Sequence, residues 1–326
     1  MNEDLFNAIK EFHKWGFSFA PTAITATAAQ LDLFSQLETP VTPEVLAQKK
    51  GLSPRGVSRL LRALARLGVL EEKRGTYRIK PSVTPLFSPS SPFYIGHYFI
   101  HAWKLQERWQ SLPQVVTTGT PLPRRDDPDF PVTLARGLFA IHWFQALELG
   151  KRLSFPPGTV LDVAGGSGVW SAGILLEHPE LKGTVLDLPQ VVERGAKPIL
   201  QGIGLSERYS FIPGDMFQVE WGQGYTAVIL GHICHALGRD QILELMERAR
   251  STLEPGGRLV VIDFLTDPQD LFPAIFSINM LVATDRGDVY SMEEYGQWLE
   301  TAGFHLTEAI PMPGPWKSAA LVATPA

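Results

Sequence analysis

The sequence lacks the features that would place it among secreted, membrane-spanning or metal-binding proteins. It contains one cysteine, Cys234, in 326 residues, so an intrachain disulfide is impossible. No apolar run approaches the roughly 18 residues that a membrane-spanning helix needs, and the acidic start, Met-Asn-Glu-Asp, is unlike a signal peptide. Neither a His-Glu-x-x-His motif nor a pair of cysteines occurs. These absences predict a cytoplasmic protein with no membrane span and no metal site.

The sequence also lacks a strong excess of charge of one sign. Lys and Arg number 29 and Asp and Glu 34, which gives a net charge of −5. Bulk electrostatics therefore do not favour nucleic acid as a partner. The apolar content of 44% is typical of a globular protein with a buried core. A length of 326 residues favours two domains.

The first 80 residues predict a small, mainly helical domain that ends in a β-hairpin. Ser53 suits the N-cap of a helix and Pro54 its first turn. In the helix that follows, the leucines share one face, as an amphipathic helix requires. The predicted elements are helices over 4–17, 20–36 and 43–49, the helix after Ser53, and a hairpin-like stretch over 69–79. Together they suggest a winged helix.

Four arginines on the other face of that helix leave two functions open for this domain. Arg55, Arg59, Arg62 and Arg66 lie at helical spacing, and such a stripe suits DNA phosphates. The first 80 residues nevertheless hold twelve basic and eight acidic residues, a net charge of only +4. We favour a solvated face on a packing or dimerisation domain over a DNA-binding, ligand-sensing regulator, because a domain with chemical motifs follows.

Aromatic residues are concentrated in the segment between this domain and the next. A helix is expected over about 93–112, a long Pro- and Asp-rich loop over 113–133, and a second helix over about 132–153, which contains His142 and Trp143. Aromatic side chains are most often part of a core. They also line apolar substrate pockets, so both interpretations remain open.

From residue 159 onward, β-like and helix-like segments alternate. Repeated βα units predict a parallel, doubly wound sheet. The last two strands are joined only by Pro311-Met-Pro-Gly-Pro315, which is too short for a crossover helix, so they should pair antiparallel. Strands are expected over 159–163, 183–188, 208–214, 225–231, 257–264, 304–311 and 317–324, and helices over 168–177, 189–203, 239–253, 270–284 and 291–302.

The first of these strands runs into a turn of small residues, Ala164-Gly-Gly-Ser-Gly168. Such a turn lets a nucleotide approach the backbone at a helix N-terminus. A dinucleotide turn requires a third glycine where this chain has Ser171, whereas a methyltransferase uses an acid, small residues and a later acid for a ribose. Asp162 and Asp187 supply these acids, although Asp187 alone would suit either cofactor.

Three further motifs follow the later strands. Gly214-Asp-Met-Phe217 ends the third strand, and its acid can accept a hydrogen bond from an adenine amino group, although a plain turn is an equally good interpretation. His232-Ile-Cys-His235 ends the fourth strand. Leu253-Glu-Pro-Gly-Gly257 precedes an apolar strand that ends at Asp263.

Together these motifs resemble one family: the class I, S-adenosylmethionine-dependent O-methyltransferases with an N-terminal winged-helix dimerisation domain. These are of the plant caffeate and flavonoid type, with bacterial relatives that act on polyketides, carotenoids and bacteriochlorophyll precursors. The motifs that carry the resemblance, in the family's order, are Leu161–Gly168, Leu186–Pro189, Gly214–Phe217, His232–His235 and Leu253–Gly257. The resemblance implies a Rossmann-like α/β sheet, domains of about 1–100 and 101–326, a homodimer, and methyl transfer to a hydroxyl of an apolar or aromatic metabolite.

The resemblance also implies roles for particular residues. His235 would be the general base, and Asp263 would orient it. Asp187 would bind the ribose of S-adenosylmethionine or of its product, S-adenosylhomocysteine. The full set of cofactor-binding residues would be Asp162, Gly165, Gly166, Gly168, Asp187, Leu188, Gly214, Asp215, Met216 and Phe217. Met280 matches a methionine of the substrate pocket, which we expect His142 and Trp143 to line as well.

The sequence departs from the family's pattern in four places. Ala164 replaces a glycine of the turn, Ala236 an aspartate after the base, and Gly231 a lysine that contacts the cofactor. Val289 stands where a second supporting glutamate is usual, and Asp288 is at best a shifted substitute. Some relatives keep the fold and cofactor but catalyse hydroxylation or pericyclic rearrangement, so non-methylating chemistry remains an alternative.

Overall fold

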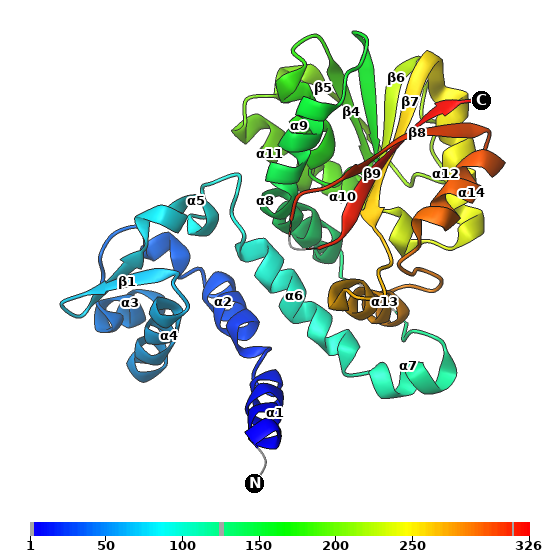
Figure 1. The fold of residues 1–326 in the computed structure, drawn as a ribbon. Helices are drawn as coiled ribbons and strands as arrows, with labels where there is room; N and C mark the ends of the chain where they lie inside the picture. The colour runs from blue at the N-terminus through cyan, green and yellow to red at the C-terminus, as the bar shows by residue number, and fades with distance from the viewer. Residues whose placement is uncertain (1–2, 124–126, 315) are drawn as a thin grey trace. The chain divides into compact units, whose positions relative to one another are not determined.

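The computed structural model describes residues 3–123, 127–314 and 316–326. The chain divides into two compact units, Met1–Leu105 and Gln106–Ala326, which Figure 1 draws in chain order from blue to red. Each unit encloses a hydrophobic core of its own, as expected of two domains.

The first unit contains the helices and the hairpin that the sequence predicts. The side chains of Thr42 and Ser53 each accept a hydrogen bond from a backbone N–H three residues on, as N-caps do. The elements are α1 (Glu3–Trp15), α2 (Ala20–Gln30), α3 (Pro43–Lys50), α4 (Pro54–Arg66), β1 (Leu70–Lys73), β2 (Thr76–Ile79) and α5 (Thr84–Phe87). The helix predicted over 20–36 ends early, because Asp32 takes a left-handed φ of 49°.

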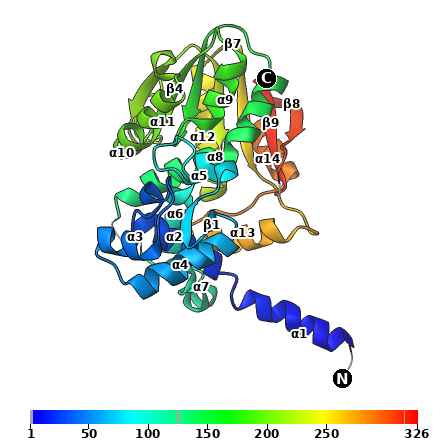
Figure 2. The same cartoon turned by 90° about the vertical axis from the view of Figure 1, so that its left-hand side faces the viewer.

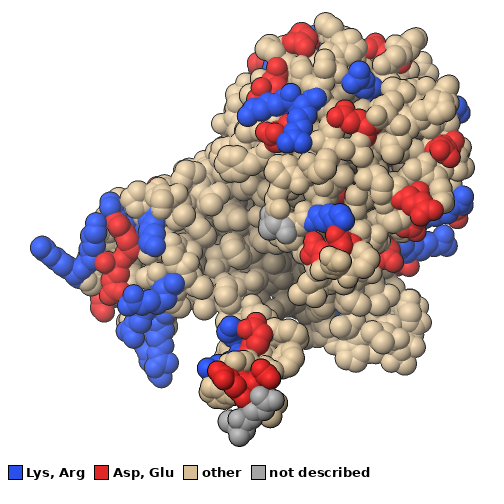
Figure 3. Space-filling model, in the orientation of Figure 1, with Lys and Arg blue, Asp and Glu red and all other residues tan. Residues whose placement is uncertain are grey.

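Helix α4 turns one face to the core and the other to solvent. Val57, Leu61 and Leu64 are buried in a cluster that includes the hairpin residue Tyr77. The four arginines of the opposite face, Arg55, Arg59, Arg62 and Arg66, are all exposed. Figure 3 shows Lys and Arg gathered over this part of the first unit. The stripe is therefore a solvated helix face.

Helix α1 has no buried side chain, and Figure 2 shows it standing clear of α2–α4. Its large apolar residues, Leu5, Phe6, Ile9, Phe12 and Trp15, are between 44% and 62% exposed. A contiguous apolar face of this kind is typical of a surface that meets a partner.

The segment after the first core contains more helix than the sequence predicts. The loop expected over 113–133 is wrong in part, because helices occupy both of its ends. Pro113 lies in the first turn of a helix, where its missing N–H is not needed, and Gly119 ends that helix with a φ of 68°. Residues 124–126 of the predicted loop lie outside the described residues. The helices are α6 (Gly96–Trp109), α7 (Leu112–Thr118) and α8 (Asp129–Arg152).

The second unit is built on a seven-stranded sheet in the order β5-β4-β3-β6-β7-β9-β8. The strands from β5 to β7 run parallel, and β9 pairs antiparallel with both β7 and β8. This confirms the predicted doubly wound sheet with an antiparallel end. Pro315, in the short link before the last strand, lies outside the described residues. The strands are β3 (Thr159–Val163), β4 (Lys182–Asp187), β5 (Tyr209–Pro213), β6 (Tyr225–Gly231), β7 (Leu253–Phe264), β8 (Phe304–Pro311) and β9 (Ser318–Pro325).

Helices cover both faces of this sheet. One apolar cluster joins the sheet to α9 and α11, and another joins it to α12 and α14 on the opposite face (Figure 1). The helix predicted over 189–203 is broken by a π-helical turn at Val192–Ala196. Among the described residues, no helix is long and apolar enough to cross a membrane. The helices are α9 (Val169–Glu177), α10 (Pro189–Val191), α11 (Lys197–Gly202), α12 (Arg239–Thr252), α13 (Leu271–Ala283) and α14 (Met292–Thr301).

Helices α8 and α9 pack backbone against backbone. A Cβ added at Gly173 would lie 2.3 Å from the carbonyl carbon of Ala146, and one added at Gly150 would lie 2.5 Å from the Gly173 oxygen. Only glycine permits this approach. Since α9 begins directly after the turn that follows β3, the contact fixes the position of that turn.

Candidate active site

The carboxyl ends of the five parallel strands meet at one edge of the sheet, which is where open α/β sheets bind their ligands. The turn of small residues follows β3 and Asp187 ends β4. Gly214 follows β5, His232 follows β6, and Asp263 lies one residue from the end of β7. The fold therefore brings together motifs that are far apart in the sequence.

The turn after β3 has the left-handed backbone that its small residues permit. Gly166 and Gly168 have φ angles of 59° and 74°, and Ala164, at the position where the family has glycine, has a φ of 50°. A Cβ at Gly165 would lie 2.7 Å from the Asp162 carboxyl carbon. Gly165, Gly166 and Gly168 therefore leave bare backbone at the start of α9, where an anion or a nucleotide can approach.

The side chain of Asp187 is held in place by the backbone of this turn and of the next residue. Its Oδ2 accepts a hydrogen bond from Gly166 N at 2.8 Å, and its Oδ1 accepts one from Leu188 N at 2.7 Å. Burial raises the pKa of Asp187 from its usual range, while the two N–H donors act to lower it. The carboxylate is thus fixed at the sheet edge by the turn that it faces.

Asp162 lies behind the turn and is fully buried. Its Oδ2 accepts hydrogen bonds from the hydroxyl of Ser171 at 2.7 Å and from the backbone N of Ser171 at 3.2 Å. Its Oδ1 has no hydrogen-bond partner among the described residues. Burial raises the pKa of Asp162 to about 7. In this structure Asp162 supports the start of α9, and its contact with the cofactor stays a prediction.

The motif after β5 forms a tight turn. Gly214 N donates to the backbone oxygen of Asp187 at 2.9 Å, which links the ends of β5 and β4. Asp215 is exposed, and its Oδ1 accepts from Phe217 N at 2.8 Å. Met216 and Phe217 pack against the main core. The plain-turn interpretation is therefore correct for the backbone, and an exposed acid remains beside the Asp187 strand.

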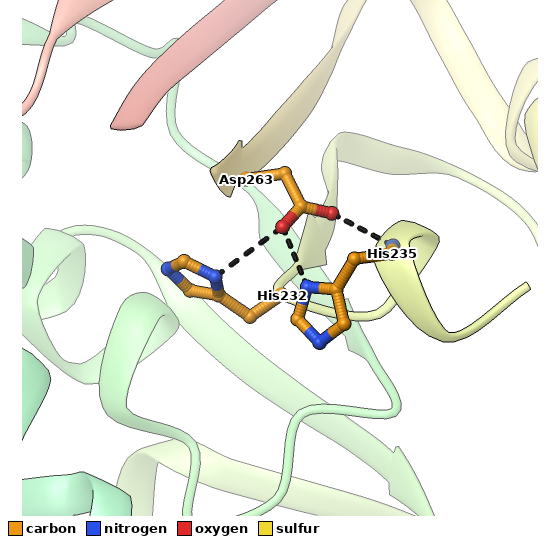
Figure 4. Close-up of side chains that lie close together, drawn as sticks. All are labelled: His232, His235 and Asp263. Atoms are coloured by element: carbon orange, nitrogen blue, oxygen red, sulfur yellow. Dashed lines mark hydrogen bonds and ion pairs between the residues drawn. The ribbon is translucent and has the colours of Figure 1, made fainter. Parts of the chain in front are cut away.

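His235 and Asp263 form a close pair at the ends of β6 and β7 (Figure 4). The ring Nδ1 of His235 lies 2.6 Å from Asp263 Oδ1, and the backbone N of His235 donates to Asp263 Oδ2 at 2.9 Å. The hydroxyl of Tyr295, on α14, also donates to Oδ2, at 3.0 Å. Asp263 is 1% exposed and the His235 side chain 13%, so the carboxylate is enclosed while the ring retains access.

A second histidine, His232, also faces Asp263. It has a left-handed φ of 54°, and its Nδ1 lies 3.5 Å from Asp263 Oδ1. Neither ring nitrogen makes a hydrogen bond to another described residue. The ring stacks on His142 at a centroid distance of 4.5 Å. Sequence reasoning named His232 within its motif but gave it no role, because its contacts are to side chains that are distant in the chain.

His142 is buried and tied to the loop between β8 and β9. The amide nitrogen of Gln145 donates to the Pro313 carbonyl at 2.6 Å, so the Gln145 oxygen must accept from His142 Nδ1 at 2.9 Å. Burial and the neighbouring His232 lower the pKa of His142 to about 3. Burial likewise lowers the pKa of His232. Both rings are therefore neutral at physiological pH.

Aromatic rings beside His235 form a partly exposed apolar wall. Phe276 meets the His235 ring edge-on at 4.9 Å. Phe272 stacks on Trp316 at 4.9 Å and on Phe276 at 5.6 Å, and Phe264 contacts all of these rings. Sequence reasoning missed these residues, although the apolar spacing of Phe272 and Phe276 on one helix is a signal that could have found them.

The other residues expected in the substrate pocket take different positions. Met280 is buried on α13, the helix that carries two rings of the wall. Trp143 instead packs against the cluster between the sheet and α11, away from His235. The structure thus groups His142 with His232 near His235, and it places Trp143 in another cluster.

His232, His235 and Asp263 also form a group whose possible metal-ligand atoms lie within 4.8 Å of one another. The Asp263 oxygens, however, already accept from the N–H groups of His235 and Phe264 and from the hydroxyl of Tyr295. Hydrogen bonding accounts for the arrangement of these groups. The absence of a metal site stays a prediction.

The structure explains two departures from the family's pattern. A Cβ at Gly231 would lie 2.4 Å from the Trp170 ring, so Trp170 fills the space of the usual lysine. Val289 is buried, and Asp288 accepts from Ser277 and from Val289 N, so this segment provides no carboxylate for His235.

Cys234, next to His235, is buried, and burial raises its pKa well above the usual range, as expected of an inert thiol.

Comparison with known proteins places the chain in a family. A model of the O-methyltransferase domain matches residues 124–305, and a model of the O-methyltransferase dimerisation domain matches residues 16–84. The chain is 30% identical over 270 residues to a 3-hydroxy-5-methyl-1-naphthoate 3-O-methyltransferase of Streptomyces sahachiroi, covering 79% of this chain and 78% of that relative. It is 29% identical to the tetracenomycin polyketide synthesis 8-O-methyl transferase TcmO of Streptomyces glaucescens, over 89% of each chain.

Solved structures show the same fold. Human N-acetylserotonin methyltransferase in complex with S-adenosylmethionine superposes with a TM-score of 0.82 at 22% identity, over 100% of both chains. Mitomycin 7-O-methyltransferase superposes with a TM-score of 0.78 at 25% identity, also over 100% of both. The chain belongs to the O-methyltransferase family that carries an N-terminal dimerisation domain. It is an S-adenosylmethionine-dependent O-methyltransferase with the class I fold, which confirms the fold, cofactor and reaction class that the sequence predicts.

Proposed function

We propose that this O-methyltransferase uses His235 as the general base in methyl transfer to a hydroxyl of a planar aromatic metabolite. The observation that carries the proposal is the 2.6 Å hydrogen bond between His235 Nδ1 and the buried Asp263 carboxylate. Because an ionised carboxylate only accepts, Nδ1 must carry the proton, and Nε2 keeps its lone pair for a substrate hydroxyl. His235 also lies at the sheet edge where the fold binds its ligands.

Asp263 is suited to support such a base. Burial alone would raise the pKa of Asp263, but the neighbouring His235 and the hydrogen bonds that the carboxylate accepts hold this pKa well below its usual range. The carboxylate therefore stays ionised. It fixes the tautomer of His235 and stabilises the imidazolium that forms when Nε2 takes a proton.

The residues after β3, β4 and β5 fit the cofactor. When bound, S-adenosylmethionine supplies a methyl group already activated on a sulfonium, so the protein needs only to position the acceptor and remove its proton. Asp187 offers a carboxylate to two ribose hydroxyls. The bare backbone of Gly165, Gly166 and Gly168 leaves room for the methionine part, and Asp215 and Met216 would hold the adenine. Leu188, Gly214 and Phe217 complete the proposed set, with Asp162 supporting the turn.

The substrate class follows from the wall beside His235. Phe264, Phe272, Phe276 and Trp316 present several ring faces and edges, which suit a flat aromatic molecule. The relatives that act on a naphthoate and on a tetracenomycin polyketide favour the same class. We assign Met280 and His142 to the surroundings of this pocket, and the structure gives no support for Trp143.

The exposed apolar residues of α1 support a homodimer. The segment after α1 matches a dimerisation domain, and α1 itself has no buried residue. We propose that this helix packs on a second copy of the chain, with helices of each chain closing the other's site. The same match disfavours the DNA-binding regulator, and the absence of a nucleic-acid partner stays a prediction.

Non-methylating chemistry is the second candidate function. The observation that favours it is the lost support at Val289, which is buried, and at Ala236. An experiment with S-adenosylmethionine labelled in the methyl group separates the two functions. Full-length protein is incubated with a panel of hydroxynaphthoates, and products are analysed by mass spectrometry. We expect the label on a substrate oxygen and one S-adenosylhomocysteine per product. Consumption of acceptor without S-adenosylhomocysteine would establish the alternative.

A further inference from the structure

The carboxylate that supports His235 is shared between two histidines. Asp263 Oδ1 lies 2.6 Å from Nδ1 of His235 and 3.5 Å from Nδ1 of His232, and Figure 4 shows both rings directed at this one oxygen. A small rotation of the carboxylate would bring Oδ1 within hydrogen-bond distance of His232 and away from His235. Something must therefore hold Asp263 in the orientation that serves His235.

The backbone N of Phe264 donates to Oδ1 itself at 2.8 Å, and the second carboxylate oxygen provides the rest of the hold. Oδ2 accepts from the backbone N of His235 at 2.9 Å and from the hydroxyl of Tyr295 at 3.0 Å. The first donor belongs to the same loop as the base. Tyr295 is the side-chain donor to Oδ2 from a separate element, α14, and it fixes the carboxylate relative to the rest of the domain.

Tyr295 is itself rigidly placed. Its side chain is 0% exposed, and its ring meets Trp298 at 5.5 Å and Tyr290 at 6.1 Å, both edge-on. The helix that carries it begins with a capping box in which Ser291 and Glu294 bond to each other's backbone N–H. Burial raises the pKa of Tyr295 well above its usual range, so the phenol stays protonated and can only donate to the carboxylate.

We propose that Tyr295 is a positioning residue whose hydroxyl keeps the Asp263 carboxylate on His235 and away from His232. Tyr295 lies six residues after Val289, where the family's second supporting carboxylate is missing. In this chain the phenol of Tyr295, which bonds to Asp263, takes over the support that a second carboxylate beside the base would give. The inference rests on the proposed role of His235 as the base.

Three variants test this inference by activity. Tyr295→Phe removes only the hydroxyl, and we expect kcat to fall roughly tenfold, the scale of one hydrogen bond to a charged group, with KM and S-adenosylhomocysteine affinity unchanged. Tyr290→Phe is the matched control, because its hydroxyl donates to the Leu237 carbonyl and not to Asp263. His232→Phe keeps a ring in the stack and supplies the second single variant of a double-mutant cycle.

The double variant Tyr295→Phe/His232→Phe gives the sharper readout. If His232 competes for the freed carboxylate, its removal should restore part of the kcat that Tyr295→Phe loses, so that the two changes are not additive. A double variant equal to the product of the two single effects would contradict the inference, and so would a Tyr295→Phe enzyme with wild-type kcat.

A spectroscopic measurement separates this inference from the proposed function. In the full-length protein labelled with 15N-histidine, the strongly hydrogen-bonded Nδ1 proton of His235 should give a low-field NMR signal. This signal should move or broaden in Tyr295→Phe and stay in place in Tyr290→Phe. The result does not depend on turnover, so it holds even if the base lies elsewhere. An unchanged signal in Tyr295→Phe would overturn the inference.

Discussion

Asp187 is the residue on which cofactor affinity should depend most strongly. Its carboxylate is fixed by Gly166 N and Leu188 N, so it meets a ribose without further ordering. Asp187→Ala should weaken S-adenosylhomocysteine binding by about 1.5–3 kcal/mol, roughly 10- to 150-fold. Titration calorimetry measures this loss, with the exposed Asp240→Ala as the control. Wild-type affinity in Asp187→Ala would mean that the ribose lies elsewhere.

Asp162 should make stability depend on pH. Burial raises its pKa from 3.8 to about 7, so the folded state binds more protons than the unfolded state between these values. Stability therefore falls as pH rises through that window. Relative to Asp162→Asn, the wild-type free energy of unfolding should decrease by up to about 4 kcal/mol between pH 4 and pH 8, taking about 1.4 kcal/mol per pKa unit.

Urea unfolding of the two proteins at a series of pH values measures this difference, in which the titrations common to both proteins cancel. A difference that stays constant from pH 4 to pH 8 would show that Asp162 does not titrate in this range. The unpartnered Oδ1 atom would then need a donor that satisfies it in solution.

At the scale of elements, the contact between α8 and α9 sets the position of the turn after β3. A Cβ at Gly173 would lie 2.3 Å from the backbone of Ala146, and backbone cannot move aside as a flexible side chain can. Gly173→Ala should therefore destabilise the protein by about 1–3 kcal/mol or more. Gly296→Ala is the matched control, because nothing lies within 4 Å of its added Cβ.

Since Gly296 lies inside α14, the control substitution should stabilise by about 0.5–1 kcal/mol through the lower helix propensity of glycine. Thermal unfolding compares the two variants with the wild type. Equal effects of the two substitutions would contradict the close helix packing.

The elements that the sequence predicted well are those with strong local signals. Thr159–Val163 and Tyr225–Gly231 are apolar, β-branched runs between turns, and both strands have the predicted bounds. Helix α7 was missed because Pro113 and the residues after it have the composition of a loop. A proline in the first turn and a glycine after the last turn are as typical of the two ends of a helix as they are of a loop.

At the scale of the whole molecule, the exposed face of α1 predicts a homodimer. Phe12 and Trp15 are 60% and 62% exposed and contact each other edge-on. Light scattering at micromolar concentration should give a mass of two chains. Phe12→Asp with Trp15→Asp should shift the protein towards monomer, because the charges cannot be buried in an apolar interface. Monomer alone in the wild-type protein would exclude the dimer.

The chain's tertiary folding decides which parts of the site could be predicted. Asp187 ends β4 and His235 lies in the turn that follows β6, each inside a recognisable motif, so their position at the sheet edge follows from topology. The contacts of His232, Tyr295 and Trp316 come from packing between distant elements, and no local pattern encodes them. The hydrogen bond from Tyr295 to Asp263 in particular depends on how α14 packs against β7, which only the three-dimensional structure gives.

The His235→Ala variant tests the central claim most directly. On a weakly acidic hydroxynaphthoate, kcat should fall about 10²- to 10⁴-fold, the usual contribution of a general base. S-adenosylhomocysteine affinity should be nearly unchanged, and the exposed His305→Ala should behave as the wild type. On 4-nitrophenol at a pH where it is already ionised, the loss should be much smaller. Full turnover of the weakly acidic acceptor by His235→Ala would show that the base is another residue.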